Sequence, residues 1–262
     1  MNILVCIKQV PGTSKVEIDE KTGVLKRDGI ESKMNPYDLY ALETALTIKE
    51  KIGGHITVVT MGPNQATSVI KESYMMGADD GYIFSDKKFA GADVLATSYT
   101  LSQGIKSLGK FDLIICGKQT TDGDTSQVGP AIAEYLNIPH VTWVCAIREL
   151  DEQKIIVEQD MENSFEVVEL EYPCLITVEK NIFQPRLPSY KLKLKTDSRV
   201  INVKTFNDFE DQNENKYGLN GSATQVERIF PPETNTKRIL WEVNCKELVE
   251  NTFNVLKAAK FI

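Results

Sequence analysis

Hydrophobic residues in the first half of the chain fall into short, continuous runs. These runs are "ILVCI" at 3–7, "ITVVTM" at 56–61, "YIF" at 82–84 and "LIIC" at 113–116. Each is too short for a helix, and β-branched residues are frequent in them. Runs of this kind predict strands that are buried on both faces.

Longer segments with helical spacing separate these runs. "PYDLYALETALTIKE" has Pro36 at a suitable first helical position. Three of its leucines share one face: Leu39, Leu42 and Leu46. The next helix is expected to start at a capping Asn64 and end at Gly77, and a third to end at Gly109. Alternating buried strands and helices predict an α/β fold, with a parallel twisted sheet flanked by helices.

The pattern changes after residue 140. "VTWVCAIREL", "KIIVEQDM", "FEVVELEY" and "CLITVEK" follow one another with only turns between them. They predict an antiparallel meander that extends the sheet edge. The polar segment "FNDFEDQNENKYGLNGS" is expected to bury little. A strand is predicted at "RILWEV" and a terminal amphipathic helix from about Lys246.

Composition and charge narrow the function classes. The chain is 42% hydrophobic and 26% charged, with a net charge of −7. This is an ordinary globular composition, and it offers no basic surface for nucleic acid. No apolar run approaches the length of a membrane span, and the first residues do not resemble a signal peptide. We therefore expect a cytoplasmic protein that inserts into no membrane.

Cysteine and histidine suggest no metal centre and no histidine-based catalysis. The two histidines, His55 and His140, lie at predicted strand starts. The cysteines are scattered singly in apolar stretches without C-x-x-C spacing, and we expect them to be buried, reduced and inert. They are Cys6, Cys116, Cys145, Cys174 and Cys245.

The polar loop "GKQTTDGDTSQVGP" at 117–130 follows a buried strand and precedes a helix. It lacks the G-x-x-x-x-G-K-[ST] order of a P-loop, and the first strand lacks a G-x-G-x-x-G continuation. "DGDTS" imitates a calcium loop, but Gln127 and Ala133 stand where glycine and glutamate are required. Asp122 lies too far past the strand end for a phosphatase-type pair.

The same loop does suit an anion. A helix that starts near Ser126 has unsatisfied first-turn amides with partial positive charge. Thr125 and Gln127 can add donors, Gly129 allows close backbone approach, and Pro130 is tolerated in a first turn. Ligands of open α/β sheets bind beyond the carboxyl ends of the strands. The loop is thus interpreted as a nucleotide cradle, with an ordinary solvated loop as the alternative.

Several stretches together resemble the β subunit of electron transfer flavoproteins. They are "ILVCIKQVP", "MNPYDLYALETALTIKE", "TMGP", "MGADDGY", "GKQTTDGDTSQVGP" and "EKNIFQPRLPSYK". They run in family order over residues 1 to about 200. The resemblance implies an adenine-nucleotide α-hydrolase-like fold in which 1–200 form the nucleotide-binding domain and 201–262 a C-terminal arm that packs on an α subunit.

The resemblance also implies a heterodimer with that α subunit, an adenine-nucleotide site, and electron delivery to acyl-CoA dehydrogenase-type flavoenzymes. Carried over by motif, the cofactor-binding residues are Cys6, Asn35, Pro36, Tyr37, Asp38, Met61, Asp122, Gly123, Asp124, Thr125, Ser126, Gln127, Val128, Gly129, Pro130, Ala131, Ile132 and Ala133.

Family members divide by what this site holds. Ordinary members hold a structural AMP, whereas electron-bifurcating members hold a second FAD that accepts hydride from NADH. Gly123 stands where ordinary members tend to carry an acidic residue, and "DGDT.QVGP" and "PRLPSY" resemble the bifurcating group. That group passes electrons to ferredoxin or flavodoxin and to a dehydrogenase. A nucleotide-binding sensor domain and an adenylate hydrolase or ligase are the alternatives from other classes.

Residues 180–195, "KNIFQPRLPSYKLKLK", have the composition of a protruding docking loop, with two prolines, apolar anchors and five cations. In the family this region is the recognition loop for the dehydrogenase. The expected docking residues are Phe183, Arg186, Leu187 and Tyr190. The alternative is a loop whose aromatic residues fold into its own domain.

Overall fold

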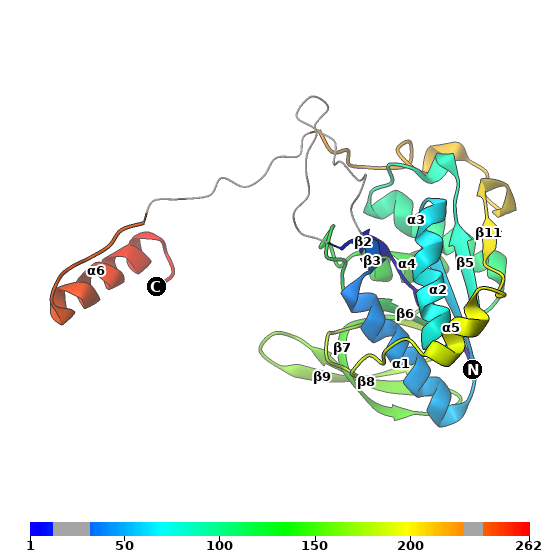
Figure 1. The fold of residues 1–262 in the computed structure, drawn as a ribbon, viewed down its shortest axis with the longest axis horizontal. Helices are drawn as coiled ribbons and strands as arrows, with labels where there is room; N and C mark the ends of the chain where they lie inside the picture. The colour runs from blue at the N-terminus through cyan, green and yellow to red at the C-terminus, as the bar shows by residue number, and fades with distance from the viewer. Residues whose placement is uncertain (13–31, 228–237) are drawn as a thin grey trace.

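The computed structural model describes residues 1–12, 32–227 and 238–262. A nine-stranded sheet in the order β11-β5-β4-β1-β6-β10-β7-β8-β9 forms its centre (Figure 1). Its strands are β1 (Asn2–Cys6), β4 (His55–Met61), β5 (Asp80–Phe84), β6 (Leu113–Gly117), β7 (His140–Leu150), β8 (Lys154–Asp160), β9 (Phe165–Glu171), β10 (Cys174–Val178) and β11 (Asn202–Lys204). A separate antiparallel pair joins β2 (Gln9–Pro11) and β3 (Ser32–Met34).

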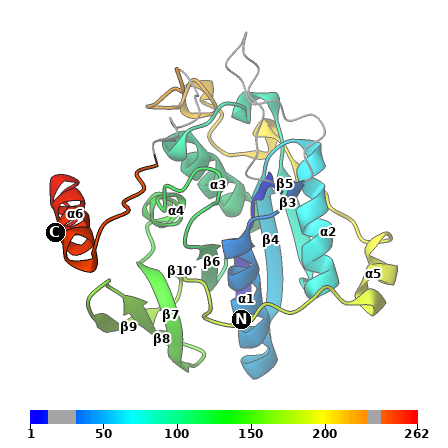
Figure 2. The same cartoon turned by 60° about the vertical axis from the view of Figure 1, so that its left-hand side comes forward.

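Helices cover both faces of the sheet. The longer ones are α1 (Pro36–Ile52), α2 (Thr67–Met76), α3 (Val94–Leu108), α4 (Val128–Leu136), α5 (Tyr190–Thr196) and α6 (Cys245–Ala258). Figure 2 shows α3 and α4 side by side, away from α1 and α2. The sheet has a hydrophobic core on each face. Successive residues of β1 point to opposite faces, so Ile3 packs on the α1/α2 side and Leu4 on the α3/α4 side.

The predicted α/β fold with a parallel sheet is confirmed. β1 pairs in parallel with β4 and β6, and β4 with β5. Helix α1 begins at Pro36, and α2 and α3 end at Gly77 and Gly109, as the sequence predicts. Asn64 is not the expected cap: it opens the short 3₁₀ turn η1 (Asn64–Ala66), because the carbonyl of Pro63 already accepts the Ala66 N–H.

The prediction of a four-stranded antiparallel meander is correct for three strands and wrong for the fourth. β7, β8 and β9 are antiparallel, but β10 inserts between β6 and β7 and runs parallel to both. Its five residues are all buried, as expected for a strand with helices on both faces. The chain therefore returns from the edge to the sheet interior before it leaves again at residue 179.

The polar segment after residue 205 buries more than predicted. β11 adds a parallel strand beside β5 and so carries the sheet beyond residue 200. Phe206, Phe209 and Tyr217 are at most 3% exposed, and they pack with Phe84 and Phe89. The expectation of little burial is wrong because β11 places these widely spaced aromatic residues against one another.

The C-terminal segment differs from its prediction at 238–243. These residues form no strand in the described chain, and Ile239 and Leu240 are exposed, since no sheet edge pairs with them. The terminal helix is confirmed as α6, which Asn244 caps. Cys116 and Cys174 are buried as expected, but Cys6 and Cys145 are only half-buried and Cys245 is exposed, which corrects the expectation that all cysteines are buried. Among the described residues, none of the helices has the length and apolar character needed to cross a membrane.

Candidate functional site

The carboxyl ends of β1 and β6 lie next to each other at the point where the strand order reverses. From β1 the chain moves through α1 to β4 on one side, whereas β6 pairs with β1 on the other side. Cys6 at the end of β1 is level with Cys116, and Met61 ends β4. Crevices at such reversals are where open α/β sheets bind ligands.

Asn35 ties the start of α1 to the loop after β6. Its side-chain N–H groups donate to the backbone oxygen of Gln119 and to Asp38 Oδ1, each at 2.9 Å. Its Oδ1 accepts the backbone N–H of Thr121 at 3.2 Å. The side chain is fully buried, the bond to Asp38 is shielded from water, and the two bonds to the loop are partly shielded. The loop is thereby held in one position relative to α1.

Asp38 is a buried carboxyl group behind this contact. Its Oδ2 accepts the backbone N–H of Lys8 at 2.7 Å. Burial raises the pKa of Asp38 to about 7, although the bonds from Asn35 and Lys8 act in the opposite direction. A side chain on Gly117 would meet Asp38 Oδ1 at 2.5 Å, so glycine is required where α1 approaches the end of β6.

Three polar contacts set the charge and shape of the loop. The Lys8 ammonium lies 2.8 Å from the Asp122 carboxylate. Burial alone would raise the pKa of Asp122, but the hydrogen bond and charge of Lys8 outweigh it and lower this pKa. Gln119 donates to the Asp124 carboxylate and accepts the Ser126 hydroxyl at 3.1 Å. The loop's two acidic side chains are therefore both engaged within the protein.

A row of free backbone donors follows these contacts. Asp124 and Ser126 have left-handed backbone conformations, with φ of 53° and 57°. Among the described residues, no protein acceptor receives the N–H groups of the five residues that follow Asp124: Thr125, Ser126, Gln127, Val128 and Gly129. Successive N–H groups in such turns, leading into a helix N-terminus, form a concavity that binds anions.

The two glycines that the sequence singled out differ in their surroundings. At Gly123 an added Cβ would meet only Thr120 Oγ1, at 3.3 Å. At Gly129 it would meet Thr177 Cγ2 on β10 at 2.5 Å. The missing side chain of Gly129 therefore serves the packing of α4 on the sheet, beside any role towards a ligand.

The cofactor-binding residues that the family resemblance implies differ in how deeply they are buried. Ile132 and Ala133 are fully buried in the α3/α4 core, and Met61 packs against the same core. The first turns of the two helices contain the remainder: Pro36 and Tyr37 in α1, and Val128, Pro130 and Ala131 in α4. Sequence reasoning missed Lys8 and Gln119, although each lies two residues past the end of its strand, β1 or β6.

The expected docking residues differ in their exposure and contacts. Leu187 and Tyr190 are 87% and 73% exposed, whereas Phe183 is half-buried. Arg186 is engaged by Glu43 and Glu50 of α1. The docking loop predicted over 180–195 is helical from Tyr190 onward: α5 begins there because Ser189 caps it, and Leu192 and Thr196 are turned away from solvent.

Comparisons with known proteins all lead to the same family. The electron transfer flavoprotein domain matches residues 22–208. The electron transfer flavoprotein subunit beta of Thermoanaerobacterium thermosaccharolyticum is 43% identical over all of both chains. The caffeyl-CoA reductase-Etf complex subunit CarD of Acetobacterium woodii is 46% identical over 88% of each chain. Protein FixA of Bradyrhizobium diazoefficiens is 38% identical over 91% of this chain and 85% of its own. The chain belongs to the electron transfer flavoprotein family, as a β subunit.

Proposed function

We propose that this chain is the β subunit of an NADH-dependent, electron-bifurcating electron transfer flavoprotein. It pairs with an α subunit, binds FAD at the carboxyl edge of the sheet, and acts in the cytoplasm. The heterodimer takes electrons from NADH and divides them between ferredoxin or flavodoxin and an acyl-CoA dehydrogenase-type flavoenzyme. A non-bifurcating carrier subunit with structural AMP is the second candidate.

The observation that carries the proposal is the row of free N–H groups at 125–129. These donors suit a diphosphate, and the site adds little negative charge against it, because Lys8 and Gln119 engage Asp122 and Asp124. The first turns of α1 and α4 border the same edge. The residues present therefore fit the phosphate part of an adenine dinucleotide.

When bound, FAD would supply the chemistry that accepts a hydride and releases electrons singly. The protein's own residues have a different task. The N–H groups of 125–129 would hold the phosphates, Asn35 fixes the loop that carries them, and Lys8 neutralises Asp122.

Gly123 supports FAD over AMP in this site. It is exposed and lacks both bulk and charge at the tip of the loop, where a second dinucleotide could approach. The relative in the caffeyl-CoA reductase-Etf complex supports a CoA-ester flavoenzyme as partner. A nucleotide-binding sensor domain would have no need of the β7–β9 extension or of exposed docking residues.

The cofactor content of the purified αβ pair tests the proposal. Two flavins per heterodimer are expected, one flavin with AMP would support the non-bifurcating carrier, and no flavin would remove the redox function. Gly123→Asp should then abolish flavin reduction by NADH while dithionite still reduces the flavins, because the carboxylate repels the dinucleotide phosphates. Gly123→Asn has similar bulk without charge and separates the two causes.

The C-terminal segment is proposed to pack on the α subunit. Helix α6 presents one apolar face formed by Leu248, Val249, Thr252, Phe253 and Leu256. None of its side chains is buried within the described chain. An amphipathic helix needs a surface for its apolar face, and the α subunit is the partner that the family provides. Deletion of 245–262 should weaken αβ association in sedimentation velocity.

A further inference from the structure

Helix α5 and its flanks form a surface with exposed apolar residues and lysines. The docking segment, residues 187–198, contains α5, which packs on α2; Leu192 is half-buried and Thr196 is buried. Outward it presents Leu187, Tyr190 and Leu194, which are 87%, 73% and 70% exposed. Three exposed lysines accompany them: Lys191, Lys193 and Lys195. On a chain of net charge −7 this is a local cationic patch around apolar anchors.

Arg186 holds the N-terminal end of this segment. Its guanidinium donates to Glu43 at 2.8–3.1 Å and to Glu50 at 2.7 Å, and its backbone N–H also reaches Glu43, at 3.0 Å. The Glu43 side chain is only 8% exposed, so its end of this forked ion pair is shielded from solvent, whereas the Arg186 side chain is 33% exposed. Ser189 N–H adds a bond to the Met75 carbonyl of α2, at 2.8 Å.

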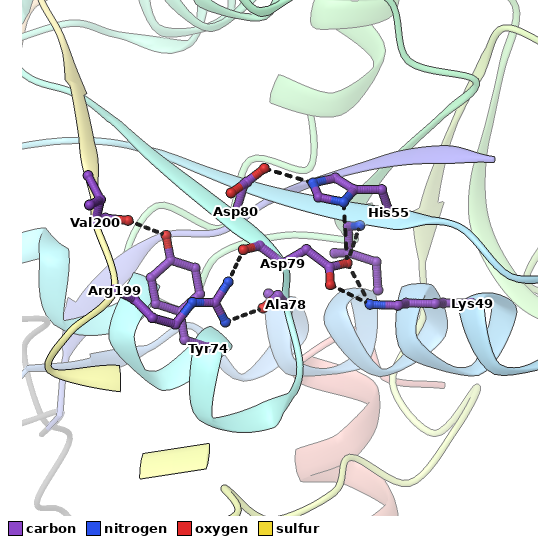
Figure 3. A network of polar contacts seen from close by, with 9 residues as sticks. Lys49, His55, Tyr74, Ala78, Asp79, Asp80, Arg199 and Val200 are labelled. Atoms are coloured by element: carbon purple, nitrogen blue, oxygen red, sulfur yellow. Dashed lines mark hydrogen bonds and ion pairs between the residues drawn. The ribbon is translucent and has the colours of Figure 1, made fainter. Parts of the chain in front are cut away.

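Arg199 holds the C-terminal end, as Figure 3 shows. Its guanidinium donates to the carbonyl oxygens of Ala78, at 2.8 Å, and Asp79. It also lies 3.9 Å from the centre of the Tyr74 ring, whose hydroxyl donates to the Val200 carbonyl at 2.8 Å. A planar guanidinium stacks on the ring while its fork of N–H groups donates to two carbonyl oxygens, a geometry that a lysine ammonium does not reproduce.

Both arginines are ultimately fixed to α1. Arg186 contacts Glu43 and Glu50 directly. Arg199 contacts Asp79, whose carboxylate is held by Lys49 of α1 at 2.6 Å and by the Ile56 N–H at 2.8 Å (Figure 3). The docking segment is thus a short span between two anchored ends.

We propose that Arg186 and Arg199 are positioning residues that hold the docking segment in its binding conformation without touching the partner. The inference rests on the proposed function, because the occupant is the acyl-CoA dehydrogenase-type flavoenzyme. The segment fits a partner surface with an apolar pocket bordered by carboxylates, which would receive Leu187 and Tyr190 and pair with the lysines. Fixing the ends beforehand removes ordering cost from the binding step.

A double-mutant cycle separates positioning from direct contact. The probe is an acyl-CoA dehydrogenase shown to accept electrons from the wild-type αβ pair, and affinity is measured by calorimetry. Arg186→Gln and Glu43→Gln should each weaken docking about tenfold, and the double variant should be no weaker than Arg186→Gln alone, because both substitutions remove the Arg186–Glu43 ion pair. Arg148→Gln, which breaks the exposed Arg148–Glu158 pair on β7 and β8, is the matched control and should dock as wild type.

The salt dependence of association gives an independent readout. Arg186→Gln and Arg199→Lys should leave its slope unchanged, whereas Lys191→Gln should reduce it, because only the lysine meets the partner's charges. If Arg186→Gln weakens docking but Glu43→Gln docks as wild type, Arg186 must contact the dehydrogenase directly. This outcome would overturn the proposal. If Leu187→Ala and Tyr190→Ala also dock as wild type, the docking surface itself is wrong. Flavin reduction by NADH should be normal in all these variants.

Discussion

The side-chain amide of Asn35 donates a 2.9 Å hydrogen bond to the carbonyl of Gln119, 84 residues further along the chain. The same side chain accepts the N–H of Thr121 at 3.2 Å. One buried residue thus decides where the nucleotide loop lies relative to α1. Since α1 packs on β1 and β6, the loop takes its position from the central strands of the sheet.

Asn35→Ala should lower both the stability of the αβ pair and its nucleotide content. The substitution leaves two part-buried backbone groups of the loop without their partner, at a cost of about 1 kcal/mol. Urea unfolding and the nucleotide released on denaturation measure the two effects. Asn64→Ala, at an exposed position in η1, is the control and should change neither. Normal nucleotide content in Asn35→Ala would mean that the loop holds its place without this contact.

Lys8→Met should weaken nucleotide binding several-fold. Lys8 lies 2.8 Å from Asp122, and without it the Asp122 carboxylate would face the phosphates unneutralised. Adding Asp122→Asn should restore most of the affinity, and Lys8→Arg should preserve it. Titration of nucleotide-depleted protein with AMP provides the measurement. If the double variant binds as poorly as Lys8→Met alone, Lys8 acts on the ligand directly rather than through Asp122.

The parallel part of the sheet could be predicted because the sequence patterns that identify its strands lie within each strand. Continuous β-branched runs such as "LIIC" describe a strand buried on both faces without reference to any partner. The place of β10 between β6 and β7 could not be predicted, since pairing partners are chosen by long-range packing. The cluster around Phe206 was missed for a similar reason: its members are dispersed among polar residues.

The candidate site was predictable to a similar degree. A polar loop that follows a buried strand and precedes a helix indicates the candidate cradle, where the N–H groups of 125–129 have no acceptor among the described residues. The residues that organise it come from elsewhere, as Asn35 and Lys8 show. The packing role of Gly129 could not be predicted, because the sequence does not distinguish a glycine that contacts a ligand from one that packs a helix against a strand. Its neighbour Thr177 lies on a strand 48 residues later in the chain.

Asp38 should make stability depend on pH. Burial raises its pKa to about 7 from an ordinary value near 3.8, so the folded state binds the proton more tightly than the unfolded state. Its contribution to stability is therefore present below about pH 4 and is lost as pH rises to about 7, with a slope of at most about 1.4 kcal/mol per pH unit. Asp38→Asn should remove this slope, as measured by urea unfolding from pH 5 to 8 at saturating AMP. Parallel pH profiles for both proteins would contradict the raised pKa.

Leu187→Ala and Tyr190→Ala should weaken docking to the dehydrogenase by about 1–3 kcal/mol, the range for losing a buried interface anchor. Both side chains are exposed in the free chain, so neither substitution should lower its stability. Calorimetry gives the affinity, and stopped-flow reduction by NADH gives the flavin activity, which should be unchanged. Loss of flavin reduction as well would indicate that the segment has a structural role in its own domain.

Gly129→Ala should destabilise the fold, because its Cβ would lie 2.5 Å from Thr177 Cγ2. Overpacking of this kind typically costs about 1–3 kcal/mol. Thr177→Ser removes that methyl group but keeps the hydroxyl that accepts the Trp143 N–H at 3.0 Å. The double variant Gly129→Ala/Thr177→Ser should therefore regain most of the lost stability in urea unfolding. Its nucleotide content then reports on the cradle alone: if stability returns and nucleotide does not, Gly129 also serves the ligand, and if both return, its role is the packing of α4 on β10.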